Sequence, residues 1–108
     1  MPSYWPLRQK IERVVADSVR LSDGVYYWRP ARENITDLQE LGILESRKKV
    51  DRKEYDGTNG YRVFAYCVNF ENAESCLDWM YEQENLLGRT GKRGPDINLV
   101  NIKAAIKI

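Results

Sequence analysis

The stretch Leu38–Val68, LQELGILESRKKVDRKEYDGTNGYRVFAYCV, determines the fold that this chain is expected to adopt. It begins with the end of a helix, and Gly42 stands where a left-handed backbone after a helix costs glycine little. Two strand-like segments, 44–55 and 61–68, then flank Asp-Gly-Thr-Asn-Gly. Asp-Gly and Asn-Gly favour turns because those residue types tolerate positive φ. We therefore expect a β-hairpin docked on a helix.

The two arms of the expected hairpin differ in character. Period-two alternation divides the second arm into two sets, Tyr61, Val63, Ala65 and Cys67 on one face and Arg62, Phe64, Tyr66 and Val68 on the other. Both sets are apolar towards the end of this arm, so we expect that end to be packed on both sides. The first arm is mostly charged beyond Ser46, and we expect its tip to stand in water.

Three helices are predicted outside the hairpin from apolar residues at intervals of three and four. They span residues 7–20, 30–41 and 72–87. In the last of these, Asn72 is a suitable N-terminal cap and Gly88 a suitable end. Residues 24–28, GVYYW, are rich in strand-forming aromatics and predict a short strand. The period of residues 97–108 fits either a helix or a strand.

These elements predict one α+β domain over residues 1–108, with two or three helices packed on a β-hairpin and a short extra strand. The charge along it is uneven although the net charge is only +1. Residues 71–87 contain five acids and no base, whereas the C-terminal tail, 88–108, contains five bases and one acid. Such asymmetry indicates an anionic partner, unless the acidic helix and the basic tail neutralise each other.

Histidine is absent, and the only cysteines are Cys67 and Cys76. The commonest general base and the commonest metal ligand are therefore missing, and a serine or cysteine nucleophile has no histidine partner. We expect a protein that is not an enzyme, with no catalytic residue, no metal site and no cofactor. Two cysteines are too few for a disulfide framework, so buried thiols are expected rather than a bridge.

The location of the protein is predicted from what its sequence lacks. It contains no run of about 18 apolar residues, so no membrane partner is expected. Its first residues, MPSYWPLRQKIER, lack the basic-then-apolar order of a signal peptide. We therefore expect a cytoplasmic protein.

The order of a helix, Leu-Gly-Ile-Leu, and a charged hairpin whose return arm begins Tyr-Arg-Val resembles the second half of a winged helix-turn-helix domain. The residues that carry the resemblance lie within 30–68 and include Leu38, Leu41, Gly42, Ile43 and Leu44. It implies a small winged-helix-like domain that binds double-stranded DNA as a transcriptional regulator. In that family the helix before the glycine enters the major groove, and a basic wing meets phosphates.

The resemblance, together with the distribution of basic residues, indicates which side chains would contact DNA. They are Arg29, Arg32 and Asn34 at the start of the second helix, and Arg47, Lys48, Lys49, Arg52, Lys53 and Arg62 in the wing. Asparagine can pair with adenine and arginine with guanine in the major groove. The alternative is a solvated edge hairpin, which lysines protect from aggregation. Asp51, Glu54 and Asp56, interleaved among the bases, favour that alternative.

Two features depart from the family pattern. Residues 21–29 contain the strand-like aromatic segment where the family places a complete helix. The expected recognition helix also carries Glu33, Asp37 and Glu40, and an acidic helix is repelled by a phosphate backbone.

The acidic second helix favours a second hypothesis, a protein-binding inhibitor or adaptor encoded by a phage or mobile element. Its contacts would be Glu74, Asp78, Trp79 and Glu82 on the helix 72–87. Because Trp79 and Tyr81 point to more than one side of that helix, it could also form a homodimer interface. A monomer with Trp79 covered by the C-terminal segment remains the other option.

Overall fold

The computed structural model describes residues 5–91 and 96–106. Its four strands form one antiparallel sheet in the order β1-β2-β4-β3. The strands are β1 (Val19–Arg20), β2 (Tyr26–Trp28), β3 (Leu44–Val50) and β4 (Val63–Val68). The helices are α1 (Trp5–Asp17), α2 (Thr36–Glu40), α3 (Arg52–Asp56), α4 (Phe70–Thr90) and α5 (Leu99–Ile106). The predicted α+β fold, with helices packed on a β-hairpin in a winged-helix-like layout, is confirmed.

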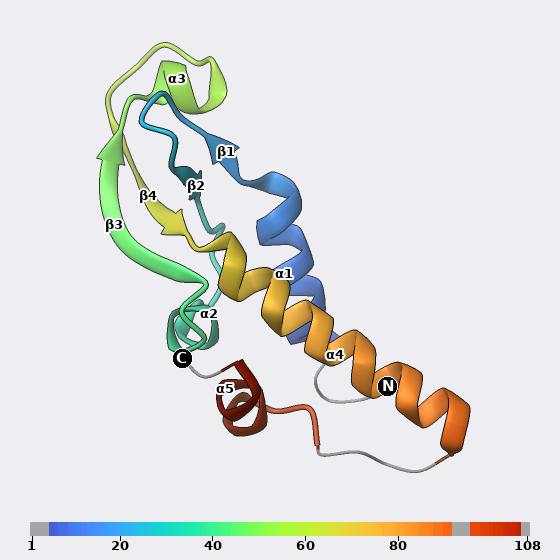
Figure 1. Ribbon diagram of the computed structural model, residues 1–108. Helices are drawn as coiled ribbons and strands as arrows, with labels where there is room; N and C mark the ends of the chain where they lie inside the picture. The colour runs from blue at the N-terminus through green and yellow to red at the C-terminus, as the bar shows by residue number, and fades with distance from the viewer. Residues whose placement is uncertain (1–4, 92–95, 107–108) are drawn as a thin grey trace.

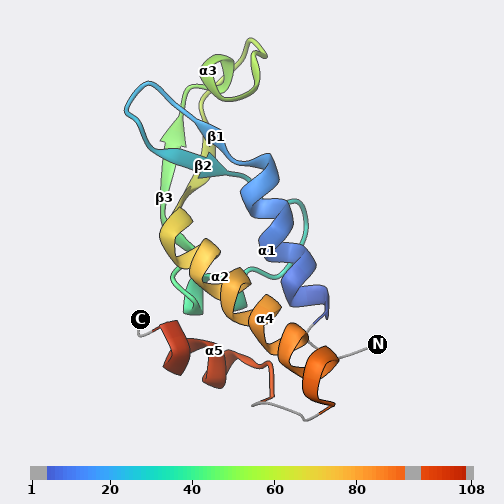
Figure 2. The same ribbon diagram turned by 45° about the vertical axis from the view of Figure 1, so that its right-hand side comes forward.

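The domain is elongated, with principal extents of 53 × 26 × 20 Å. The helices α1 and α4 run side by side, and α5 lies against α4 at the opposite end of the molecule from the hairpin tip (Figure 1). The short helix α3 lies at that tip, beyond the strands, in both views (Figure 2). The hairpin therefore projects away from the part of the domain that the long helices cover.

Two apolar clusters occupy the two faces of the sheet. The larger cluster joins the sheet residues Trp28, Leu44 and Val68 to α1, α2, α4 and α5. The helices contribute Ile11, Val14, Leu38, Ala73, Cys76, Met80 and Ile102, and Leu41 joins them directly after α2. The smaller cluster consists of Leu21, Tyr27, Val50, Ala65 and Cys67. Ala65 and Cys67 thus face away from Val68, as the alternation in the second arm predicts. Both cysteines are free and buried, as expected.

The step from α2 into the hairpin follows the prediction. Gly42 has φ +69° and reverses the chain, and Ile43 and Leu44 are buried beyond it. The start of α4 then secures this step, because the side-chain amide of Asn72 donates to the Gly42 carbonyl at 3.1 Å. The N–H of Asn69 donates to the Ile43 carbonyl at 2.8 Å. These bonds satisfy backbone groups that a buried turn would otherwise leave without partners.

The first arm of the hairpin is shorter than predicted, because β3 ends at Val50 rather than continuing to Tyr55. The side chain of Asp51 accepts a hydrogen bond from the N–H of Lys53 and caps α3, which ends at Gly57 with φ +77°. A side-chain cap competes with the strand ladder for the backbone donors, and here the cap prevails. Residues 52–56 consequently form a helical turn at the tip of the hairpin.

The second helix is also shorter than predicted, because α2 begins at Thr36 and not near Pro30. The side-chain oxygen of Asn34 accepts a hydrogen bond from the N–H of Thr36 at 2.9 Å, which holds a turn before the helix. Residues 30–35 form a non-helical connection. Arg29, Arg32 and Asn34 were expected at the start of the helix, and they lie before it.

Other boundaries move by a few residues. The first helix ends at Asp17, and Val19 already belongs to β1. The long helix α4 is capped by Asn69, not Asn72, and it continues through Gly88 to a left-handed Gly91. Residues 99–106 are helical, which decides between the two options for the C-terminal segment. The described part of the basic segment 88–108 is therefore folded.

Candidate nucleic-acid interface

A bulge in β3 determines which basic side chains lie together on the hairpin. Leu44 pairs with Val68, but Arg47 pairs with Tyr66, so β3 contains one residue more than β4 over this interval. The extra residue reverses the alternation. Arg47 and the next residue but one, Lys49, therefore share the face of Leu44 and not that of Val50.

Arg47, Lys49 and Phe64 form one exposed group on this face, here termed the hairpin patch. Lys49 pairs directly with Phe64 across the two strands. The guanidinium carbon of Arg47 lies over the Phe64 ring, 3.9 Å from its centroid, and the Lys49 ammonium lies 5.4 Å from it. Phe64 is 46% exposed, and both cations are exposed. Cations over a ring face are attracted by the ring quadrupole, so the patch is an organised arrangement.

The remaining basic residues of the hairpin are dispersed. Lys48 pairs with Ala65 and lies on the opposite face. Arg52 forms an ion pair with Asp56 at 3.6 Å, and exposed Lys53 is on α3. Arg62 and Lys49 line a hollow of about 300 Å³ together with Asp23, Asp51 and Glu54. The six bases predicted as one cluster thus lie on several surfaces. The hollow lined by Arg62 and Lys49 also contains three acids.

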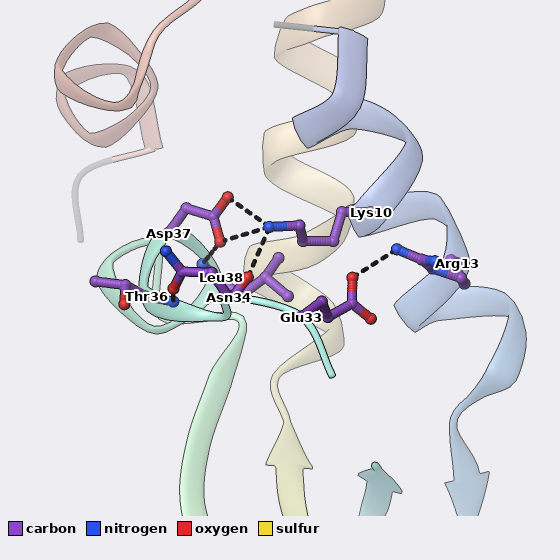
Figure 3. A network of polar contacts seen from close by, with 7 residues as sticks. All are labelled: Lys10, Arg13, Glu33, Asn34, Thr36, Asp37 and Leu38. Atoms are coloured by element: carbon purple, nitrogen blue, oxygen red, sulfur yellow. Dashed lines mark hydrogen bonds and ion pairs between the residues drawn. The ribbon is translucent and has the colours of Figure 1, made fainter. Parts of the chain in front are cut away.

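The three acids near α2 all have basic partners, and Figure 3 shows two of these ion pairs, those of Asp37 and Glu33. The Lys10 ammonium lies 3.0 Å from a carboxylate oxygen of Asp37 and also donates to the Asn34 carbonyl at 2.7 Å. The Arg13 guanidinium lies 2.7 Å from Glu33. Lys103 of α5 lies 3.7 Å from Glu40. The acidic charge that opposes DNA binding is therefore compensated, but α2 is also tied to α1 and α5.

The predicted base-reading residues are poorly placed for that role. Arg32 is exposed within the connection 30–35, and Arg29 is exposed directly before it. The backbone N–H of Arg29 donates to the Tyr55 hydroxyl at 3.1 Å. The side-chain oxygen of Asn34 is occupied by Thr36, whereas pairing with adenine needs both the oxygen and the amino group. With five residues, α2 is about 7.5 Å long, which is short for a helix that has to lie in a major groove.

The residues of the alternative protein-binding surface divide into two groups. Glu74, Asp78 and Glu82 are exposed along one side of α4, and Glu71 extends this stripe. Within residues 5–91 and 96–106, none of these four carboxylates forms an ion pair. Trp79 is half-buried against the larger apolar cluster, so it supports the core of the domain and does not extend the stripe.

Phe64 is the residue of this region that the sequence did not single out. Its place on the face of Arg62 was predicted, but its contact with Arg47 depends on the bulge in β3. A signal was present in the charged first arm, since three consecutive basic residues there place cations on both faces of the hairpin, and a cation opposite an exposed aromatic is attracted by the ring. The register needed to recognise that pairing was not available from the alternation alone.

Comparisons of the chain with protein-family models, with curated proteins and with solved structures find no match. In the part of the chain that the structure describes, no helix is both long and apolar enough to cross a membrane. That same part holds no group of three cysteines or carboxylates able to bind a metal ion.

Proposed function

We propose that this protein is a small double-stranded-DNA-binding protein of winged-helix type, a cytoplasmic transcriptional regulator that contacts DNA mainly through its hairpin. The observation that carries the proposal is the hairpin patch. Arg47 and Lys49 are exposed on one face and, among the described residues, neither forms an ion pair with a carboxylate. Their charge is therefore available for phosphate, whereas Lys10, Arg13 and Lys103 are engaged.

The proposed mechanism is electrostatic. Each phosphate that a lysine or arginine neutralises releases a condensed counterion, so affinity falls steeply as salt rises. The wing, and not α2, supplies most of this contact, because α2 is short and held by ion pairs to α1 and α5. Phosphate contacts position a protein but carry no sequence information. The protein is consequently expected to discriminate weakly between DNA sequences.

Titration of a fluorescent DNA duplex at two salt concentrations tests the proposal. Replacing both Arg47 and Lys49 by Ala should weaken binding at low salt and reduce the slope of log K against log salt by about two. The matched control, Arg13→Ala with Lys103→Ala, removes the same charge from two ion pairs outside the hairpin strands. It should leave the salt slope unchanged, and it should weaken binding less than the hairpin variant even though it uncovers Glu33 and Glu40. Absence of wild-type binding at low salt would exclude the proposal.

The second candidate function is a protein-binding inhibitor or adaptor that uses the acidic stripe of α4. It is favoured by the exposed, unpaired carboxylates of Glu74, Asp78 and Glu82. The same charges oppose a homodimer through this face, because like charges would meet across it. Lysine at all three positions should abolish capture of a basic partner protein, while the Arg47 and Lys49 double variant should retain it.

A further inference from the structure

We propose that Phe64 is a positioning residue that orients Arg47 as a two-pronged site for a phosphodiester. This inference rests on the proposed function and deepens it. Arg47 and Phe64 come from different strands of the hairpin, and their contact exists because the bulge in β3 brings Arg47 to the face of Phe64. The ring and the guanidinium together, and not the charge alone, make the site.

The distance between the two groups restricts the orientation of the guanidinium. Its central carbon lies 3.9 Å from the Phe64 centroid. Carbon atoms in optimal contact are about 3.5–4.0 Å apart, so a guanidinium turned edge-on would press a nitrogen into the ring. A guanidinium whose plane lies along the ring face fits this distance without such a contact, and it is the stacking that arginine favours over aromatic side chains.

A stacked guanidinium still presents its N–H edge outward. Its donors form a rigid fork whose geometry matches two phosphate oxygens, and contacts made by both prongs add energy and geometric specificity. An exposed arginine without a supporting surface must order a long side chain before it can bind in this way. Phe64 provides that order in advance, since it restrains Arg47 while leaving the outer edge open.

Charge and exposure around the ring identify the ligand as an extended polyanion. Lys49 places a second cation 5.4 Å from the same ring centroid. Among the described residues no carboxylate forms an ion pair with either cation. Phe64 is 46% exposed, so burial in the core does not account for a phenylalanine here. A phosphodiester backbone supplies the successive charges that such a pair can neutralise.

Two single variants and their combination test the role of the ring. Phe64→Leu removes the ring and keeps an apolar strand residue, whereas Arg47→Lys keeps the charge and removes the plane. Each should weaken binding of a fluorescent duplex by roughly three- to tenfold at fixed salt, with the salt slope unchanged because the number of cations is unchanged. The double variant should lose little more than either single variant, because the two side chains act as one unit.

Phe64→Tyr is the conservative control, and it should retain wild-type affinity because it keeps an aromatic face. Arg47→Lys also leaves the apolar residues of the hairpin intact, so it tests the site even if Phe64→Leu destabilises the fold. Wild-type affinity in a folded Phe64→Leu protein would overturn the positioning role, as would fully additive losses in the double variant. Failure of the wild-type protein to bind any duplex would instead overturn the proposed function and, with it, the phosphodiester as ligand.

Discussion

At the scale of single residues, the turn between β1 and β2 is stabilised by one carboxylate. Asp23 accepts a hydrogen bond from the Tyr27 hydroxyl at 2.7 Å and another from the N–H of Val25 at 3.0 Å. These bonds, the Tyr27 bond most of all, lower the pKa of Asp23, and Lys48 adds to the effect. The same bond raises the pKa of Tyr27, a residue that is only 2% exposed.

Tyr27→Phe should therefore raise the pKa of Asp23 towards its ordinary value. A depressed carboxyl pKa contributes stability above the ordinary pKa, and that contribution is lost as the pH falls through the lowered pKa of the folded state. Between neutral pH and that acidic range, the free energy of unfolding should therefore fall less in the variant than in the wild type. Titration of the Asp23 carboxyl by NMR, with urea unfolding at neutral and acidic pH, measures both effects.

Tyr26→Phe is the matched control for this change. The Tyr26 ring packs 4.4 Å from the Phe70 ring, and its hydroxyl makes no hydrogen bond within the described residues. Removing that hydroxyl should leave the Asp23 pKa where it is. An unchanged Asp23 pKa in Tyr27→Phe would show that the Val25 bond and the charge of Lys48 suffice to hold it.

At the scale of elements, a side-chain cap can override the surrounding sequence pattern and start a short helix. The clearest example is α3, which interrupts the predicted first arm of the hairpin and places Arg52 and Lys53 on a helical turn. The cap of Asp51 at its start and the left-handed Gly57 at its end enclose only five residues. An element of this length depends on its ends, because nucleating a helical turn is costly.

Asp51→Ala should consequently destabilise the protein by about 0.5–2 kcal/mol and loosen α3. Urea unfolding measures the first effect, and faster hydrogen exchange at the Tyr55 amide, which donates to the Asp51 carbonyl, measures the second. Asp51→Asn retains an equally good cap and should remain close to the wild type. If the alanine variant exchanged as slowly as wild type at Tyr55, packing of α3 rather than its cap would hold the turn.

At the scale of the whole molecule, α5 belongs to the main core although it follows a segment rich in basic residues. Ile102 is fully buried among residues of α1, α2 and α4, and Lys103 adds the ion pair to Glu40. Neither α3 nor the hairpin patch, at the other end of the molecule, contributes a buried residue to this core. The elongated domain therefore separates the part that holds the fold from the part proposed to bind phosphate.

Ile102→Ala should destabilise the domain by about 2–5 kcal/mol, because it leaves a cavity in a packed core. Val100 on the same helix is 75% exposed, and Val100→Ala should change the free energy of unfolding by less than about 0.5 kcal/mol. Equal effects of the two substitutions on urea unfolding would mean that α5 is not part of the cooperative unit. DNA affinity of the folded Ile102→Ala protein should match the wild type.

The sequence predicted the elements whose signals are local and consistent, namely the Gly42 step, the alternation of the second arm and the existence of the long acidic helix. It did not predict the lengths of α2 and β3, because Asn34 and Asp51 offer the backbone hydrogen bonds that compete with the regular pattern. For the candidate site, it identified Arg47 and Lys49 among the basic residues. It could not pair them with Phe64, since that pairing depends on the strand register.

The bulge between Leu44 and Arg47 gives β3 one residue more than its partner strand at this point. Glu45 and Ser46 are exposed there, so most substitutions should be tolerated. Removal of Glu45 or Ser46 would give β3 and β4 the same number of residues over this interval, so Leu44 would stay opposite Val68 and Arg47 opposite Tyr66. A deletion between Arg47 and Val50 would instead move one of these two residues to the other face of the sheet. The bulge therefore absorbs a change of length that the paired strand beyond it does not.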